Sequence, residues 1–533
     1  MMKSATLLLL AASMVVATGV TALSPPPPTP FATEGKYAAF SVVASTTGGA
    51  GVVVGTASKH ARNPLMVQDQ AWEPRFDNGY PNILHDPNSN AAPYQLWWGG
   101  CCGGMPAPEG KASCDVQLWE YATSQDGLGW DKPDLGLFDL STIWDGFKHI
   151  GTKNNVVLKG GGIGVYRDRN PHAPEATNAS RAFKAFGVGC FGAGGAADCV
   201  SGTAVSADGL RWADATDVAW PKPQRYDDHQ NILWDARHDR YLLTTRAYTG
   251  TSGRDIALAT SGGTSFGNWS KTADLVESGS EAHQLYSQIT FPYYNIYLGL
   301  VMVFDTANPT TVGTVECRLS WSPDGKKWGW VYEALGGDDA GGDAGGDDGA
   351  ARPRGLAGSL GGPSIIPHGA AGAFDSHIVF AASHPFTPLS AANGDDVQLY
   401  YMGGNGPHNG PRNSSLGLAT LRPDGFAGVG STTAGKPDSS GFTTTRVACT
   451  GAVLYVTMDV LDEGANVRVG SPDVPGATTS VALTANATDA SVAFATGRGK
   501  TTTRAFAGAV GKEVSLVFEI DGPALVYSFG FRD

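Results

Sequence analysis

Two short motifs recur along this chain at intervals of tens of residues, and they restrict the folds that are open to it. Ser-x-Asp-Gly-x-x-Trp occurs at residues 124–130, 206–212 and 322–328. Asn-Ile-Leu-x-Asp occurs at residues 82–86 and 231–235, each time followed by a Tyr-x-Leu segment. Asp-Gly supplies the positive φ angles of a tight hairpin turn, and the Trp packs back across that turn. The regular return of such β motifs is typical of radially repeated sheets.

The strand-like segments around these motifs form five repeat units, which predicts an all-β chain with a five-bladed β-propeller over residues 67–423. The units begin near residues 72, 154, 225, 281 and 362. A Gly-, Ala- and Asp-rich stretch at residues 336–358 interrupts them, and we expect it to be a disordered surface insertion because it cannot bury apolar area. A calcium loop is the alternative, but the stretch has no fixed ligand spacing.

The residue pattern of the sequence changes near residue 424. Residues 424–533 alternate small and β-branched residues and contain no further Asp-Gly-x-x-Trp copy. This pattern predicts a separate C-terminal β-sandwich of ordinary domain size.

The N-terminus is typical of an exported protein. Residues 1–22 have a positive start at Lys3, an apolar core and a small-residue cleavage site, which predicts a signal peptide. A membrane anchor is the alternative, but the apolar run is short for a span. Residues 23–66 begin with a Pro-rich linker and continue as an expected irregular lead-in. The mature chain is therefore predicted to be soluble and secreted.

Charge and cysteine content agree with that compartment. A net charge of −13 argues against nucleic acid and anionic membranes as partners. Seven cysteines are an odd number, so at least one stays unpaired, and Cys190–Cys199 is the first candidate disulfide because it closes a short Gly-rich loop. The cysteine spacings match no standard zinc set. No metal ligand and no cofactor are predicted, and whether a metal sits in the funnel is left open. Four glycosylation sequons stand at Asn178, Asn268, Asn413 and Asn486. The oligomeric state is left open.

Acidic and amide residues gather at the edges of the predicted inner strands, which in a propeller line a central funnel. Glycoside hydrolysis needs a carboxylate as nucleophile or base and a protonated carboxyl as acid. The predicted catalytic residues are Asp77, Asp168, Asp228 and Glu281. The predicted substrate-binding residues are Trp72, Asn78, Arg167, Asp227, His229 and His283.

Several of these residues have a purely structural interpretation. Asp86 and Asp235 are expected to cap β-turns, and the Asp of each Ser-x-Asp-Gly turn is expected to be structural. Asp168 stands between two arginines, so an ion-paired loop residue is the alternative for it. Trp72, Trp97 and Trp98 could stack on sugar rings, although tryptophans in such strands more often belong to the core.

Over roughly residues 70–530 the chain resembles the five-bladed propeller glycosidases, the clan of glycoside hydrolase families 32 and 43, and is most similar to secreted family-32-like proteins. The resemblance is carried by residues 121–137, Asn154-Asn155, Arg167-Asp168-x-Asn170-Pro171, residues 227–235 and His283-Gln284-Leu285-Tyr286. It implies three funnel carboxylates. Asp77 and Asp168 match the first two, and Glu281 is the candidate for the general acid.

The chain departs from the family pattern at three points. Phe76-Asp77-Asn78-Gly79 only approximates Asn-Asp-Pro-Asn-Gly, and Arg167-Asp168 is followed by Arg169 rather than Pro. The third unit has no Glu-Cys pair, which occurs later at Glu316-Cys317. We therefore predict a secreted glycoside hydrolase acting on an oligo- or polysaccharide, and these departures leave its sugar and linkage, fructan included, open. The alternative is a carbohydrate-binding propeller without catalysis; a sialidase ranks lower, because the Asp-Gly-Trp turns are architectural and no arginine triad can be recognised.

Overall fold

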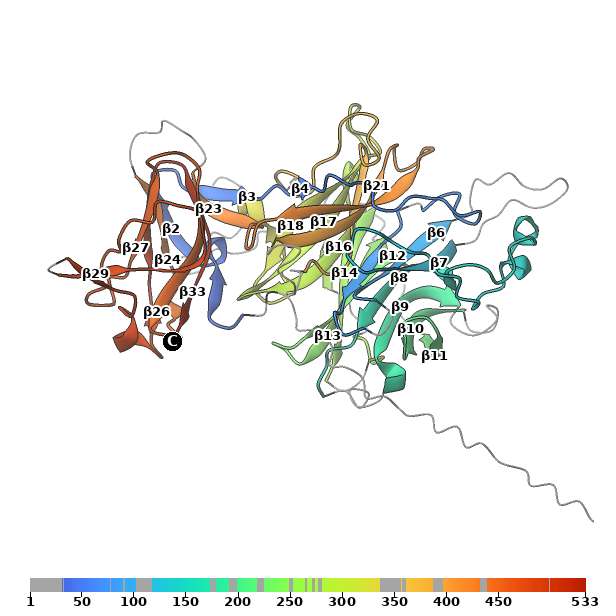
Figure 1. Cartoon of the computed structure of the whole chain (residues 1–533), viewed down its shortest axis with the longest axis horizontal. Coiled ribbons are helices and arrows are strands. Elements are labelled where there is room, and N and C mark those ends of the chain that lie inside the picture. The colour runs from blue at the N-terminus through green and yellow to red at the C-terminus, as the bar shows by residue number, and fades with distance from the viewer. Residues whose placement is uncertain are drawn as a thin grey trace, which may run out of the picture.

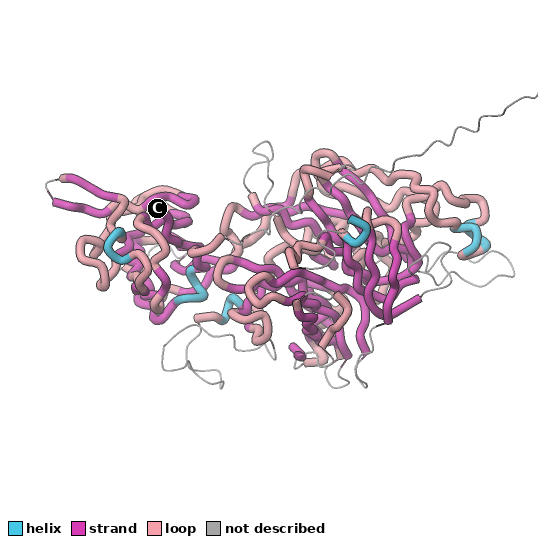
Figure 2. Tube along the Cα trace, turned by 90° about the horizontal axis from the view of Figure 1, so that it is seen from below, coloured by secondary structure: helices cyan, strands magenta, loops and turns pink. Residues whose placement is uncertain are grey.

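The computed structural model is all-β (Figures 1 and 2), as predicted. The structure describes residues 31, 33–76, 78–89, 92–101, 117–172, 179–190, 199–217, 225–248, 253–263, 266–270, 274–276, 280–335, 356, 361–386, 396–431, 439–497 and 499–533. Within these ranges the only helices are short 3₁₀ turns, and none has the length and apolar composition needed to cross a membrane. The predicted signal peptide lies outside the described residues, as does the predicted insertion except for Leu356.

The first two predicted units share one antiparallel sheet whose strands follow chain order. Its strands are β5 (Asn82–His85), β6 (Tyr94–Cys101), β7 (Gln117–Ser124), β8 (Val156–Arg167), β9 (Phe183–Cys190), β10 (Cys199–Ser206) and β11 (Trp212–Asp217). The 3₁₀ turns η2 (Leu140–Thr142), η3 (Asp145–Phe147) and η5 (Ala179–Arg181) lie in the connections. The start of β8 pairs with β7 and the remainder pairs with β9, which joins the two units.

The third unit is a sheet of its own, and the fourth and fifth share another. The third consists of β12 (Arg225–Asp235), β13 (Arg240–Tyr248), β14 (Arg254–Gly262) and β15 (Asp274–Val276). The last sheet consists of β16 (His283–Tyr293), β17 (Ile296–Asp305), β18 (Val315–Ser322), β19 (Gly329–Trp330), β20 (Ile378–Ala381), β21 (Val397–Gly404), β22 (Ser414–Leu421) and β4 (Ser58–Lys59), with η6 (Val331–Glu333) after β19. We call β5–β7, β8–β11, β12–β15, β16–β19 and β20–β22 strand groups one to five.

The three Ser-x-Asp-Gly-x-x-Trp motifs form the same turn, as predicted. In the first, Ser124 Oγ accepts a hydrogen bond from the N–H of Gly127 (2.8 Å), whose φ is +75°. Asp126 Oδ1 accepts from the N–H groups of Leu128 and Gly129 (2.8 Å each), and these bonds help to lower the pKa of its carboxyl. The other two copies repeat these bonds at Gly209 and Gly325.

Carbonyl groups of these turns also connect neighbouring strand groups. In each case a side chain of one group donates to the turn of the next. The pairs are Trp97 Nε1 with Gly209 O (2.8 Å), Arg240 Nη2 with Asp324 O (2.9 Å) and Tyr400 OH with Gly127 O (2.8 Å). The last pair connects group five back to group one. Strand β4, which precedes group one in the chain, likewise pairs with β22 of group five.

The Asn of the Asn-Ile-Leu-x-Asp motif connects the first strand of one group to the next group. Buried Asn82 donates to the carbonyl of Ile163 (2.9 Å) and accepts from the N–H of Val165 (3.1 Å), both on β8. Buried Asn231 accepts from the N–H of Thr290 on β16 (3.0 Å). The motif therefore repeats because the same connection is made twice.

Asn82→Ala is expected to destabilise the protein by about 3 kcal/mol, because it leaves a buried N–H and a buried C=O of β8 without partners. Asn231→Ala, with one such bond, is expected to cost about half as much. Urea unfolding of the two variants and the wild type measures the difference. An Asn82→Ala midpoint equal to that of the wild type would contradict this role.

Asp86 and Asp235 cap turns, as predicted. Asp86 Oδ1 accepts from the N–H of Asn88 (3.0 Å), and Asp235 Oδ1 accepts from the N–H of Arg237 (3.3 Å). Each carboxylate is buried and also pairs with an arginine: Asp86 with Arg167 (3.2 Å), and Asp235 with Arg240 (2.9 Å).

The C-terminal residues form two sheets that face each other through aromatic side chains. One contains β28 (Ala487–Ser491), β26 (Val453–Val460), β33 (Ala524–Arg532), β23 (Ala427–Ser431), β3 (Gly51–Val54) and β1 (Lys36–Ala38); the other contains β2 (Val43–Thr47), β24 (Ser440–Thr444), β32 (Val517–Asp521) and β27 (Asn466–Gly470). Small pairs are β25 (Val447–Ala448) with β31 (Glu513–Val514) and β29 (Phe494–Gly497) with β30 (Lys500–Thr502); the 3₁₀ turns are η1 (Ala39–Val42) and η8 (Ala507–Ala509). Phe518 of the second sheet contacts Phe529 of the first, with ring centroids 5.5 Å apart.

Residues 36–54 were expected to belong to an irregular lead-in, and the structure differs here. Strands β1, β2 and β3 pair with β33, β24 and β23, so the N-terminal segment (blue in Figure 1) lies among the C-terminal strands. Lys36 fixes the arrangement through buried Asp424 (2.7 Å) and through Asp489 (2.7 Å). Each of these strands is only three to five residues long, and its partners lie about 370 to 490 residues away, so no local sequence pattern indicates it.

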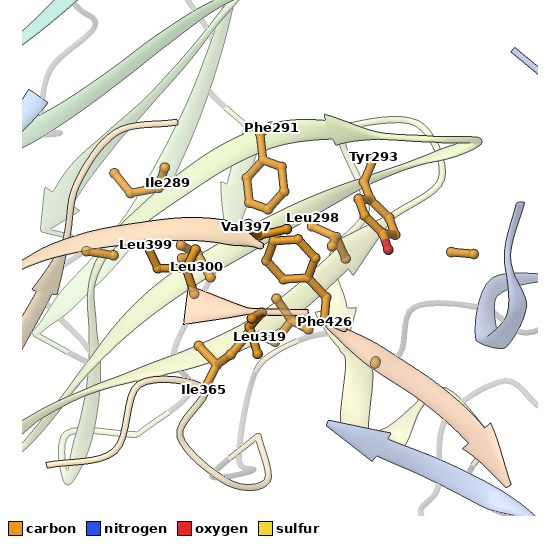
Figure 3. Close-up of a cluster of buried hydrophobic side chains, with 14 of the residues drawn as sticks. Ile289, Phe291, Tyr293, Leu298, Leu300, Leu319, Ile365, Val397, Leu399 and Phe426 are labelled. Atoms are coloured by element: carbon orange, nitrogen blue, oxygen red, sulfur yellow. The ribbon is translucent and has the colours of Figure 1, made fainter. Parts of the chain in front are cut away.

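A continuous apolar core joins the strand groups to the C-terminal sheets. Phe426, which precedes β23, contacts Phe291 (5.4 Å between ring centroids) and Tyr293 (5.3 Å) of β16. Figure 3 shows these rings beside aliphatic side chains of β17, β18 and β21. This contact fixes the C-terminal sheets against one end of group four.

Candidate functional site

Asn78 connects the beginning of strand group one to groups four and five. Its side-chain nitrogen donates to the hydroxyl groups of Tyr80 (2.7 Å) and Tyr286 (3.0 Å), and its Oδ1 accepts from Arg412 Nη2 (2.8 Å). Asn78 is 2 % exposed, so all of these bonds are made away from solvent. Three segments that are far apart in the sequence therefore meet at one amide.

Cationic side chains surround the ring of Tyr286. The guanidinium carbon of Arg246 lies 4.2 Å from the ring centroid and that of Arg254 lies 5.0 Å from it, both within cation–π range. His408 Nε2 lies 2.9 Å from the Tyr286 hydroxyl. Arg246 and Arg254 belong to group three, which is the fourth strand group to reach this point.

His229 completes the arrangement from β12. Its Nδ1 lies 2.7 Å from Ser287 Oγ, and its ring centroid lies 5.0 Å from that of Tyr80. Burial, followed by the charge of Arg246, lowers the pKa of His229 to about 3, so the ring is neutral at neutral pH. Its Nε2 is buried and has no hydrogen-bond partner among the described residues.

The backbone is strained at two members of this arrangement. His229 has a φ of +71° and Tyr80 a φ of +41°, which side-chain-bearing residues seldom adopt. Such conformations persist where the surrounding structure enforces them, and they are concentrated at functional sites. We call the eight residues of this arrangement the Asn78 cluster: Asn78, Tyr80, His229, Arg246, Arg254, Tyr286, His408 and Arg412.

Three predicted acids flank the Asn78 cluster in the chain. Asp77 directly precedes Asn78, but it lies outside the described residues. Asp227 and Asp228 directly precede His229 on β12, where the backbone of Asp227 pairs with that of Arg246. The catalytic and binding roles of these three residues stay predictions.

Asp168 does not join the Asn78 cluster, which differs from the expected convergence. Its Oδ2 accepts from the Tyr241 hydroxyl (2.7 Å) and lies 3.4 Å from Nζ of buried Lys184. Tyr241 and Arg246 are five residues apart on β13, a separation of roughly 17 Å along a strand. Asp168 follows its strand, whereas Asn78 precedes β5 and His229 lies in the first half of β12. These contacts match the alternative of an ion-paired loop residue, and Arg167 beside it pairs with Asp86 (3.2 Å).

The remaining predicted residues fall into two sets. Glu281 is exposed. His283 is half-buried and is the first residue of β16, three residues before Tyr286, and its Nε2 lies 3.9 Å from Asp305 Oδ2. Trp72 is buried and donates from Nε1 to Asn155 Oδ1 (2.9 Å). Trp97 and Trp98 are fully buried, so all three tryptophans serve the core rather than a sugar platform.

The sequence analysis missed a buried carboxyl pair, Glu73 and Glu120. Glu73 Oε2 accepts from Lys132 Nζ (2.6 Å) and from the N–H of Asp69 (3.1 Å), at the segment that leads to Asp77. Glu120 is fully buried on β7; burial first, and then the charge of Glu73, raises the pKa of Glu120 well above its usual range. The signal was present in the sequence: Glu120 shares a strand face with Leu118 and Ala122, which are completely buried.

Among the described residues, no group of three or more His, Cys, Asp or Glu side chains is arranged to hold a metal ion. Cys317 and Cys449 are free and buried. Cys190 and Cys199 stand directly opposite each other across β9 and β10. The position fits the predicted disulfide, which stays a prediction.

Comparison with known proteins finds only distant likeness. No family model and no curated protein matches the chain. Solved structures similar to it include an N-acetylgalactosamine deacetylase from F. plautii (13 % identity, TM-score 0.39, covering 69 % of this chain and 95 % of the other). A family-32 β-fructofuranosidase from Bombyx mori is also similar, with 10 % identity and a TM-score of 0.36, covering 88 % of this chain and 95 % of the other. An exo-inulinase from Aspergillus awamori has 12 % identity and a TM-score of 0.36, covering 89 % of this chain and 99 % of the other. Likeness at this level says nothing about activity.

Proposed function

We propose that the chain is a secreted five-bladed propeller glycoside hydrolase with a C-terminal β-sandwich, and that the Asn78 cluster marks its active site. In this proposal the five strand groups are the blades and β4 completes the fifth. One observation carries the proposal: side chains from groups one, three, four and five meet at Asn78 and Tyr286, beside two residues with positive φ. Such convergence at the beginnings of the inner strands is where a propeller places its funnel.

The proposed chemistry uses the acids that flank the cluster. Asp77 is the proposed nucleophile or base, Asp228 the acid that assists it, and Glu281 the candidate proton donor. Neutral His229, whose Nε2 has no partner among the described residues, is proposed to hold sugar hydroxyl groups together with Asp227 and His283. The amide of Asn78, which is bonded to Tyr80, Tyr286 and Arg412, is proposed to position these three side chains for the sugar. Asp168 and Arg167 are assigned to the fold, because their partners hold them away from the cluster.

A second candidate function is carbohydrate binding without hydrolysis. It is favoured by the engagement of Asp168 with Tyr241 and Lys184, since the family pattern places a catalytic carboxylate at that motif. In this case the Asn78 cluster would bind a sugar but would lack a complete set of catalytic carboxyls.

Incubation of the purified full chain with a broad oligosaccharide panel tests the choice. We expect new reducing ends from at least one member, and calorimetry on the same panel reports binding. Binding without turnover would establish the second function, and neither binding nor turnover on any member would contradict both.

A further inference from the structure

A small cavity lies away from the Asn78 cluster, where the ends of β8, β12 and β16 meet the segment after β20. Its volume is about 20 Å³, and a cavity of roughly 10–15 Å³ is enough for one water-sized particle. The lining includes Tyr166, Arg169, Trp234, Phe291 and His384. Trp234 lies five residues after His229 on β12, beyond the β-bulge between Asp227 and Asn231, so the cavity lies further along the strand than the cluster.

Arg169 places a guanidinium at this cavity without a counter-charge. Its Nε is buried and has no hydrogen-bond partner, and no described carboxylate lies within ion-pair distance of it. The acid that influences it electrostatically, Asp86, is paired with Arg167 (3.2 Å). Burial lowers the pKa of Arg169, but a guanidinium stays protonated in proteins. Arg169 is partly exposed as a whole, but its Nε is buried without a partner, so the cavity favours a hydrogen-bond acceptor with a negative charge.

His384 also lines this cavity. Its ring hydrogen-bonds to the backbone of Ile232, and burial, followed by the charge of Arg169, lowers its pKa to about 3. Its Nε2 is buried and has no partner among the described residues, and its φ is +58°. A strained backbone therefore holds a second orphaned nitrogen at the same cavity as the guanidinium.

We propose that the cavity between Arg169 and His384 binds one small inorganic anion of about the size of chloride. A water molecule could satisfy the two nitrogens, but it could not neutralise Arg169. Neutral His384, whose other nitrogen faces Ile232, presents a lone pair at Nε2, so an anion there favours proton uptake by the ring. Anion binding is therefore expected to tighten as the pH falls.

The groups that face His384 and bear on this pH dependence are few. Arg169 opposes protonation of the ring, and the hydroxyl of Tyr166 is occupied as acceptor of the Trp234 N–H (3.1 Å). Asp86 and Arg167 form their own pair next to the cavity. The bound anion would thus connect β8, β12 and the segment after β20, and its loss would loosen groups two, three and five together.

Thermal unfolding of the full chain in sodium chloride and in sodium gluconate, at equal ionic strength, tests the proposal. Chloride is expected to raise Tm saturably by roughly 2–5 °C, and more at pH 5.5 than at pH 8, whereas gluconate is too large to enter. Equal responses to both salts would mean that the cavity holds water only, and would overturn the proposal.

The matched variants are Arg169→Met and, as a control, Arg211→Met on an exposed turn. Arg169→Met is expected to abolish the chloride response, and Arg211→Met to retain it; a retained response in Arg169→Met would contradict the assignment. If Arg169→Met does not fold, anomalous diffraction from wild-type crystals soaked in bromide tests the site instead. An anomalous peak between Arg169 and His384 supports the site, and its absence overturns it.

Discussion

Asp77→Asn is expected to lower kcat by about 10²–10⁴-fold on the oligosaccharide that the panel selects, with little change in KM. The substitution keeps the shape of the side chain but removes the carboxylate that the proposal places next to Asn78. Steady-state kinetics of the purified variant measures the loss. A free energy of unfolding equal to that of the wild type would show that the loss of kcat comes from the missing carboxylate and not from misfolding.

Asp168→Asn is the matched control, because it makes the same change in the other predicted aspartate. Its kcat is expected to stay within a few-fold of the wild type. Its stability is expected to fall by about 3 kcal/mol, because Lys184, which is fully buried, loses a charged partner. The opposite pattern, with activity lost at Asp168 and retained at Asp77, would restore the family assignment of Asp168 and refute the site proposed around Asn78.

The second large expected effect is a pH dependence of the folding stability that comes from Glu120. Its pKa in the folded protein is raised above the unfolded value of about 4.3. Unfolded chains therefore release this proton at lower pH than folded ones. The contribution to stability is complete below about pH 4.3 and is lost as the pH rises to the folded pKa, with a slope of up to about 1.4 kcal/mol per pH unit.

Glu120→Gln tests this dependence, because glutamine keeps the size and neutrality of the protonated side chain. The groups facing Glu120 are the carboxylate of Glu73, with Lys132 bound to it, and the amide of Asn155. Chemical unfolding from pH 5 to pH 8 is expected to show a falling stability in the wild type and a flatter profile in Glu120→Gln. Parallel profiles would mean that Glu120 is not the group that titrates.

The turns of this fold were predictable and the long-range pairings were not. The Ser-x-Asp-Gly-x-x-Trp motif specifies its own hydrogen bonds within seven residues, so three copies give three identical turns. Strands β1–β3 are short, and the strands that pair with them lie about 370 to 490 residues away in the sequence.

The candidate site was predicted in part, for a similar reason. Asn78 and His229 were selected because they precede or begin strands, and the structure brings them to the same cluster. Asp168 was selected with them although it follows its strand, and residues at opposite ends of neighbouring inner strands cannot meet. Arg246, Arg254 and Arg412 were missed, because only the pairing of β13, β14 and the segment before β22 brings them to Asn78 and Tyr286.

The most direct test of the central claim is a crystal structure of Asp77→Asn with the oligosaccharide that the panel selects. We predict a sugar ring within hydrogen-bond distance of a side chain of the Asn78 cluster, with the scissile bond facing residue 77. A sugar bound only at the C-terminal sheets, or beside Asp168, would contradict the claim that the Asn78 cluster is the carbohydrate site.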